Sequence, residues 1–180
     1  MNEPDRQPTL EGSLVLLRPS TAEDWDALFA VASDPLVWEV HPAHDRWQEP
    51  VFRAYFDAGI ASGGALTIID RATSAVIGSS RFDNWEPEAD EIEIGWTYLA
   101  RSHWGRGYNA QIKSLMLDHI HRFVGTAVFT VGETNIRSRR AMEKIGGILR
   151  EGIHMRLMAG EMKPHVIYEI PRPVRKPPGA

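Results

Sequence analysis

Two glycines stand just ahead of a helical apolar pattern, in the segment 104–110 with the sequence WGRGYNA. Glycine lets the backbone approach a ligand closely, and the first turn of a helix offers unpaired N–H groups and a partial positive charge. Arg101 and Arg106 add positive charge beside this turn. These features together predict a binding site for an anionic group such as a pyrophosphate.

Several nucleotide-derived cofactors are bound by turns of this kind. A nucleoside triphosphatase loop requires Gly-Lys-Ser or Gly-Lys-Thr, which the sequence lacks. A dinucleotide fingerprint is matched by Gly105, Gly107 and Ala110, and Glu133 stands where its ribose-binding acid is found. However, Arg106 separates the two glycines, and the chain that follows is too short for a sheet of roughly six strands. Dinucleotide binding therefore stays open only as an alternative.

The elements around the turn alternate between strands and helices. The apolar run 14–17 predicts a buried strand, and the capping-box pattern at 20–23 opens a helix. Residues 37–50 are expected to form a loop or broken helix. Further strands are expected at 65–70, 75–82, 91–99, 127–131, 148–149 and 166–170, and further helices at 51–61, from the glycine turn to 125, and from a cap at Thr134 or Asn135 to 146. This order predicts a mixed α/β domain around one sheet.

The strand 91–99 alternates polar with apolar residues. The apolar Ile92, Ile94 and Trp96 are expected on one face, with Glu93 on the other. This strand leads directly to the glycine turn, so Glu93 is expected near whatever the turn binds.

Composition limits the class of protein. The chain has 180 residues, 43% hydrophobic and 24% charged, as is usual for one globular domain. The net charge of -4 gives no basic excess for binding nucleic acid or an anionic membrane. No cysteine is present, which excludes disulfides and thiolate ligands. Without a signal-peptide pattern or an apolar run of roughly 18 residues, we expect a soluble, cytoplasmic protein. We expect a flexible N-terminus at 1–11, a domain at 12–171 and a proline-rich tail at 172–180.

A series of short motifs carries a family resemblance. They are LVLLRP at 14–19 followed by Asp24, EIGW at 93–96, WGRGYNA at 104–110, NIRS at 135–138 and EKIGG at 143–147. Their order and spacing, over nearly the whole chain, resemble the GNAT superfamily of N-acetyltransferases, especially its ribosomal-protein (Rim-type) branch. The resemblance implies one GNAT-like α/β (α+β) domain with a mixed, mostly antiparallel central sheet flanked by helices. It also implies that acetyl-CoA is the acetyl donor. Many relatives have a catalytic tyrosine where this chain has Met142.

The activity implied by this resemblance is direct transfer of acetyl to a primary amine, either a protein N-terminus or a small amine. An alkylamine has a pKa of about 10 and must first lose a proton. Glu93 is the expected base, directly or through water, unless it is a solvent-facing strand residue. Backbone N–H groups near Tyr98 and Leu99 are expected to stabilise the carbonyl oxygen. Ser138 is expected to protonate the thiolate, unless it only supports helix capping.

The remaining expected site residues follow from the same resemblance. The expected cofactor contacts are Tyr98, Leu99, Arg101, Trp104, Gly105, Arg106, Gly107, Tyr108, Asn109, Ala110, Asn135 and Arg140. Trp38, His41 and Trp47 are expected to line the acceptor pocket, although loop packing would also explain them. His119 and His121 are two residues apart and cannot form the i, i+4 pair of a helical metal site, so no metal is expected.

Two questions about partners stay open. The acidic segment 86–91 would suit a cationic acceptor. A non-catalytic acyl-CoA sensor or scaffold is the alternative to an enzyme, and analogy alone is compatible with a homodimer.

Overall fold

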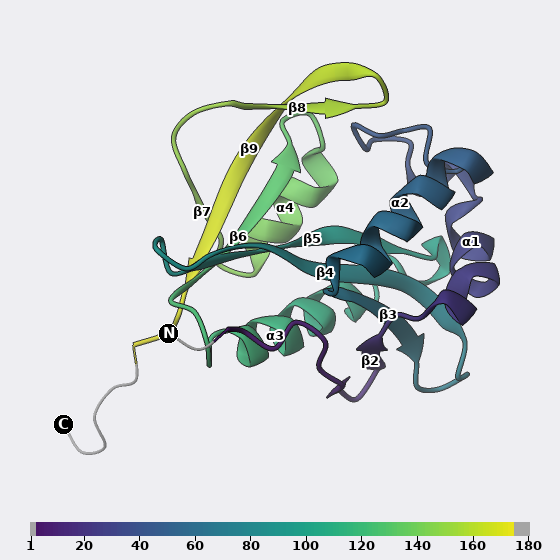
Figure 1. Ribbon diagram of the computed structural model, residues 1–180, viewed down its shortest axis with the longest axis horizontal. Helices are drawn as coiled ribbons and strands as arrows, with labels where there is room; N and C mark the ends of the chain where they lie inside the picture. Colours follow the sequence, from purple (N-terminus) through teal and green to yellow (C-terminus); the bar gives the residue numbers. More distant parts are fainter. Residues whose placement is uncertain (1–2, 175–180) are drawn as a thin grey trace.

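The computed structural model, which describes residues 3–174, is built on one twisted sheet (Figure 1). Within these residues the sheet has nine strands in the order β1-β2-β3-β4-β5-β6-β9-β7, and β8 pairs with β9. The strands are β1 (Leu10–Glu11), β2 (Val15–Pro19), β3 (Ala65–Asp70), β4 (Val76–Glu86), β5 (Glu91–Leu99), β6 (Thr126–Gly132), β7 (Ile148–Leu149), β8 (His154–Met158) and β9 (Glu161–Pro171). Every neighbouring pair is antiparallel except β5 and β6, which run parallel. The expected mixed, mostly antiparallel sheet is confirmed.

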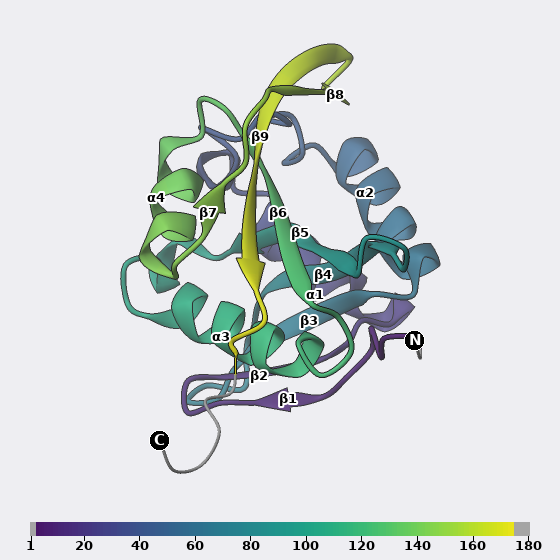
Figure 2. The ribbon, with the colours of Figure 1, turned by 90° about the vertical axis from the view of Figure 1, so that its left-hand side faces the viewer.

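Four α-helices of the described chain cover the sheet. They are α1 (Trp25–Ala32), α2 (Glu49–Ser62), α3 (Tyr108–Ile120) and α4 (Ile136–Lys144). Figure 2 shows α2 on one side of the sheet and α3 on the other. The buried apolar side chains form two clusters. One includes residues of α1 and α2, and the other includes residues of α3 and α4. None of these helices is both long enough and apolar enough to cross a membrane.

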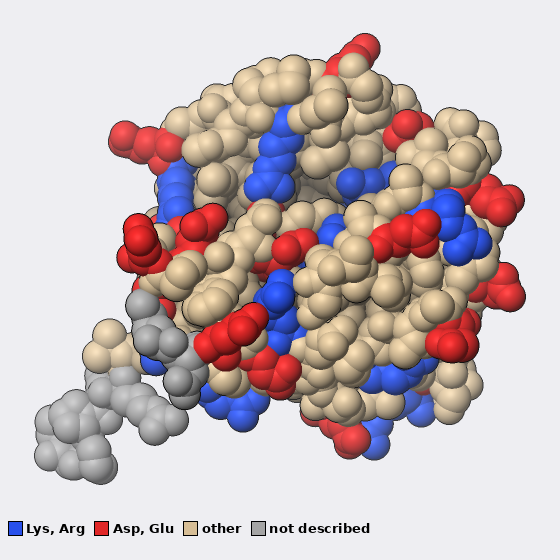
Figure 3. All heavy atoms as spheres, viewed as in Figure 1, with Lys and Arg blue, Asp and Glu red and all other residues tan. Residues whose placement is uncertain are grey.

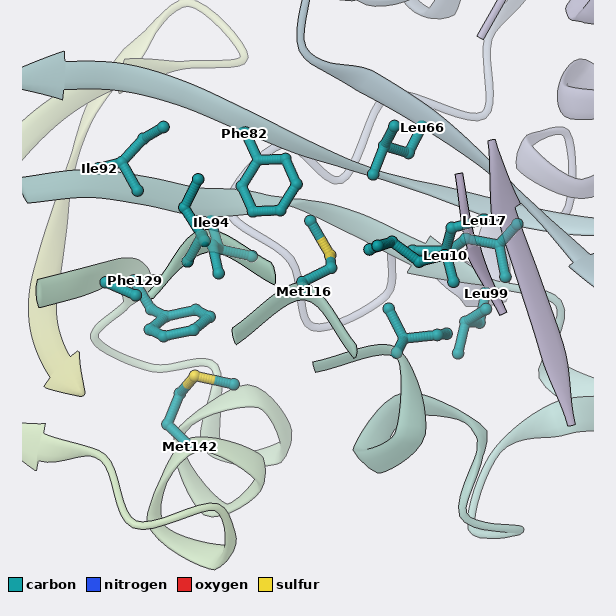
Figure 4. Close-up of a cluster of buried hydrophobic side chains, with 14 of the residues drawn as sticks. Leu10, Leu17, Leu66, Phe82, Ile92, Ile94, Leu99, Met116, Phe129 and Met142 are labelled. Atoms are coloured by element: carbon teal, nitrogen blue, oxygen red, sulfur yellow. The ribbon is translucent and has the colours of Figure 1, made fainter. Parts of the chain in front are cut away.

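The larger cluster fixes β5 and β6 against α3 and α4. Ile92 and Ile94 of β5 are fully buried and belong to the same cluster as Phe129 of β6, Met116 of α3 and Met142 of α4 (Figure 4). Burial of each such side chain contributes about 1.5–3 kcal/mol relative to exposure. The strand and the two helices that border the candidate site are therefore held by one continuous core.

A buried carboxylate joins β2, β3 and the beginning of α1. Asp24 accepts hydrogen bonds from Arg18 at 2.6 and 2.8 Å, from Thr67 at 2.9 Å and from the Thr21 backbone at 2.9 Å. The capping box is therefore present, but it begins at Thr21 rather than at Ser20 and opens a short 3₁₀ turn before α1.

The structure departs from the expected elements in several places. β8 and the first half of β9 form a hairpin that the sequence did not predict, and β4 runs on to Glu86. Regular structure begins at Leu10, within the segment expected to be flexible, because β1 pairs with β2. The start of the domain at residue 12 stays a prediction, and most of the proline-rich tail, residues 175–180, lies outside the described residues.

A bulge also breaks the expected alternation of β5. The register against β4 shifts between the pairs Ser79–Tyr98 and Arg81–Gly95, and Trp96 has a positive φ of 52°. Trp96 therefore does not continue the face of Ile92 and Ile94 as expected. It lies under the guanidinium of Arg81, 4.1 Å from the ring centroid.

Candidate active site

The two parallel strands separate at the centre of the sheet. β5 and β6 are paired only from Glu91–Thr126 to Glu93–Val128, and beyond this point β5 stays with β4 while β6 stays with β9. A cavity of about 810 Å³ opens between the diverging strands, lined by β5 residues 93–99, β6 residues 129–132, the glycine turn and α4. The unpaired edge of β5 thus faces a cavity large enough for an extended ligand.

The glycine turn forms one end of this cavity. Gly105 and Gly107 have φ values of 69° and 84°, which glycine adopts at no steric cost. Gly107 is the N-cap of the 13-residue helix α3, with no side-chain cap and no acidic residue in the first turn. The first N–H groups of α3 therefore have no side chain of the turn as partner and favour an anion.

The other residues of this turn divide into two groups. Gly105, Gly107, Asn109 and Ala110 line the cavity. The side chain of Tyr108 is instead buried and donates to Asp70 over 3.1 Å.

Two further predicted contacts with the cofactor also lie outside the cavity lining. Arg101 is ion-paired with Asp34 at 2.6 Å, and Arg106 donates to the carbonyl of Ser102. Trp104 lines the cavity but also supports it, because its Nε1 donates to the carbonyl of Leu99 over 3.0 Å.

The N-terminus of α4 forms the facing wall. Asn135 is the N-cap, since its side chain accepts from the Ser138 backbone over 3.1 Å. Asn135, Ser138 and Arg140 all line the cavity, together with the buried Met142. The guanidinium of Arg137 lies over the Trp104 ring, 3.9 Å from its centroid. The structure therefore brings both predicted α4 contacts and the candidate proton donor to one wall.

Glu93 lies at the point where the strands part. Its side chain is 5% exposed, so it is not a solvent-facing strand residue. Its carboxylate accepts from both Nη atoms of Arg156, at 3.0 and 3.2 Å, and from Asn84 at 2.7 Å. A carboxylate has about four acceptor positions, so these three hydrogen bonds leave one of them unused. Arg156 belongs to β8, which the sequence did not predict, and no local pattern indicated this partner.

The acceptor-pocket predictions divide in a similar way. Trp38 and His41 line the cavity, whereas Trp47 is exposed and lies outside the lining. His41 Nδ1 accepts from the Ala43 backbone over 2.9 Å. Burial, followed by the nearby Arg46, lowers the pKa of His41 to about 3, so this imidazole is neutral at pH 7.

Sequence reasoning missed a buried cation in the same cavity. Lys113 of α3 is 3% exposed, and its Nζ donates to Thr97 Oγ1 over 2.6 Å. Burial lowers its pKa from 10.5 to about 7. In the sequence it is one polar position of an amphipathic helix, with no sign that it faces inward.

The acidic segment 86–91 plays no part in this lining. Glu91 is ion-paired with Arg150, and Asp90 lies 3.9 Å from Arg172. The cavity lining gives no support to the expectation that this segment favours a cationic acceptor, which stays a prediction. Among residues 3–174, no cluster of His, Cys, Asp and Glu side chains has the arrangement of a metal site.

Comparison with known proteins identifies the family to which the chain belongs. The acetyltransferase (GNAT) domain family matches residues 15–148. The chain therefore belongs to the GNAT acetyltransferase family. A search of curated proteins finds no significant match.

Solved structures share this fold at low sequence identity. A GCN5-related N-acetyltransferase from Brucella melitensis is 22% identical with a TM-score of 0.80, over 92% of this chain and 79% of that one. A spermidine N-acetyltransferase from Vibrio cholerae, in complex with CoA and spermine, is 14% identical with a TM-score of 0.69, over 89% and 97%. The microcin C7 self immunity acetyltransferase, in complex with acetyl-CoA and AMP, is 12% identical with a TM-score of 0.75, over 93% and 98%.

Proposed function

We propose that this protein transfers acetyl from acetyl-CoA to a primary amine by direct attack, without a covalent enzyme intermediate. The observation that carries the proposal is the open edge of β5, which joins the glycine turn to Glu93 within one cavity. The turn would hold the diphosphate of CoA, and the β5 edge would pair with its pantetheine arm. The acetyl group would then lie near Glu93, at the end of the cavity where the acceptor amine would bind.

Each proton and bond of this reaction has a candidate group. The amine nitrogen forms a bond to the thioester carbonyl carbon while its proton passes to Glu93, directly or through water. Among the backbone N–H groups near Tyr98 and Leu99, that of Leu99 points away from β4 and would stabilise the negative carbonyl oxygen. The C–S bond then breaks, and the thiolate takes a proton from Ser138, which lines the cavity and recovers a proton from water.

The family branch and setting are part of the same proposal. The WGRG turn and Ser138 support the ribosomal-protein (Rim-type) branch. Because acetyl-CoA is an intracellular metabolite, the proposed activity implies a cytoplasmic protein, and a homodimer is proposed by analogy alone. The solved neighbours contain spermine in one case and AMP in the other, so they do not select an acceptor.

Comparison of two glutamates tests the proposed base. Thiol release from acetyl-CoA is measured with a panel of primary amines for the wild type, Glu93→Gln and the control Glu91→Gln. Glu91 is on the same strand but is ion-paired with Arg150 outside the cavity lining. Loss of a general base should lower kcat about 10²–10⁴-fold in Glu93→Gln, and Glu91→Gln should change it by less than about threefold. Equal activity of all three proteins would contradict the role of Glu93.

A non-catalytic acyl-CoA sensor is the second candidate. It is favoured by Met142, which lines the cavity but has no proton to give, and by Arg156, which occupies most of the Glu93 carboxylate. CoA binding without acceptor-dependent thiol release from any amine would support the sensor and overturn the enzyme.

A further inference from the structure

Cationic side chains gather at the end of the cavity lined by Arg46, Glu93 and Arg156, which we call its acceptor end. Figure 3 shows a hollow between the β8–β9 hairpin and α2, with Lys and Arg atoms on its walls. Within the described chain, the only acidic residue that lines the cavity is Glu93, and it is already paired with Arg156. The positive charge that remains has no equivalent negative charge from the protein.

Arg46 is one of the cavity's cations for which no carboxylate of the described chain is a counterion, and it lies on the same side as Arg156 and Glu93. Its guanidinium lies 4.5 Å from the Tyr55 ring centroid and 5.5 Å from that of Trp38, and its Nη2 is 3.9 Å from Met158 Sδ. Within residues 3–174, no carboxylate oxygen lies within 4.0 Å of its nitrogens. The aromatic rings and the thioether hold the guanidinium in place but leave most of its N–H donors unused.

No carboxylate among residues 3–174 forms an ion pair with this guanidinium. Arg81, the other arginine near Tyr55, is already paired with Asp83 at 3.3 Å. Asp45, the residue before Arg46, acts on its charge at longer range but has no carboxylate oxygen within 4.0 Å of its nitrogens. Burial is the largest cause and lowers the pKa of Arg46; Tyr55 and Asp45 oppose this shift, and Arg81 adds to it. Enclosing a half-buried cation in this way is costly unless a ligand completes its pairing.

Arg46 also lies at the same end of the cavity as the proposed base. Met158 and Arg156 are two residues apart on β8, so their side chains point to the same side of the strand. Met158 contacts Arg46, and Arg156 contacts Glu93. A small molecule in this part of the cavity would therefore meet a free cation at one end and the Glu93 carboxylate at the other.

We propose that Arg46 binds an anionic group, a carboxylate or a phosphate, on the acceptor, and that the acceptor amine is thereby directed to Glu93. This inference rests on the proposed function and narrows its substrate to amines that carry such a group. The guanidinium matches both anions because it donates two parallel N–H bonds to either.

Matched acceptors test the proposal directly. Acetyl transfer is measured with L-phenylalanine against L-phenylalaninamide for the carboxylate and with O-phosphoethanolamine against ethanolamine for the phosphate. Preference for the anionic member of a pair identifies which anion is used. Arg46→Met should lower kcat/KM for that member by roughly ten- to a hundredfold, the effect of one hydrogen-bonded charge, and leave the neutral member within threefold.

Arg53→Met is the matched control. Arg53 also stacks on an aromatic ring, 3.2 Å from the Trp25 centroid, but lies outside the cavity lining. It should leave both members of each pair unchanged. Wild-type preference for the neutral member in both pairs, or an equal loss on both members in Arg46→Met, would overturn the proposal.

A binding measurement separates this inference from the proposed function. The melting temperature of the CoA-saturated protein is measured with added inorganic phosphate and with succinate. A rise in the wild type and in Arg53→Met, but not in Arg46→Met, supports the anion site even if no amine is acetylated. Acetylation of neutral amines without any such rise would support the enzyme and overturn the anion site.

Discussion

Replacement of Lys113 by methionine should stabilise the protein at neutral pH. Lys113 is buried, and its ammonium group donates one hydrogen bond within residues 3–174, to Thr97 Oγ1. The difference between 10.5 and about 7 in its pKa corresponds to roughly 4–5 kcal/mol, the cost of burying the charged form. Methionine removes this cost but loses a hydrogen bond worth about 1 kcal/mol. We expect Lys113→Met to gain about 3 kcal/mol at pH 7, or roughly 6–12 °C in Tm for a domain of this size.

The sign of the pH dependence gives a sharper test. Unfolded Lys113 keeps its proton until about pH 10.4, whereas the folded protein releases it near pH 7. The unfolded state therefore binds more protons in this range, so wild-type stability gains a contribution that grows with pH. Lys113→Met lacks that contribution, and its advantage over the wild type should shrink towards pH 10.

Urea unfolding followed by circular dichroism from pH 6 to pH 10 measures both effects. Lys163→Met is the control, because Lys163 is ion-paired with Glu161 in the β8–β9 hairpin and should change stability by less than about 1 kcal/mol. A Lys113→Met protein that is less stable than the wild type at pH 7, or a difference that does not vary with pH, would refute the reasoning.

Three further substitutions test the turn, a helix cap and a buried ion pair. Gly107→Glu should abolish CoA binding measured by calorimetry while lowering stability by only about 1–2 kcal/mol; Gly146→Glu, at a matching φ of 85° with open space, should still bind, and retained affinity in Gly107→Glu would contradict the diphosphate site. Asn135→Ala should cost about 1 kcal/mol of unfolding free energy through the lost cap, and Asn135→Ser should restore most of it in the same urea titration. Burial would raise the pKa of Asp24, but hydrogen bonds led by Arg18 lower it overall. Its contribution to stability is therefore fully present above the unfolded pKa of about 3.9 and is lost as the pH falls from there through the lower folded pKa. Asp24→Asn should therefore cost about 3 kcal/mol at pH 6 and less at pH 3; an equal cost at both pH values would exclude this linkage.

The parts of the site that could be predicted from sequence are the local ones. The turn at 104–110, the helix that follows it and the strand that contains Glu93 each have a periodicity or residue type that acts within a few neighbours. The bulge at Trp96 was not predictable in this way, because a positive φ at tryptophan depends on the shifted register against β4.

The charged partners could not be predicted, because their roles depend on distant residues. Arg156, which contacts Glu93, lies on β8. The residues of this strand are exposed or half-buried and show little apolar alternation, so the sequence gives no signal of a strand there. Arg46 and Lys113 read as ordinary polar residues of a loop and a helix. Only the folded chain shows that Arg46 lies between α2 and β8 and that Lys113 points to Thr97 of β5.

A crystal structure of the protein with acetyl-CoA tests the central claim most directly. We predict the diphosphate at the N-terminus of α3, on the backbone N–H groups of the turn 104–110, and the pantetheine arm along the unpaired edge of β5. Acetyl-CoA bound elsewhere, with this turn and edge free of ligand, would contradict the account.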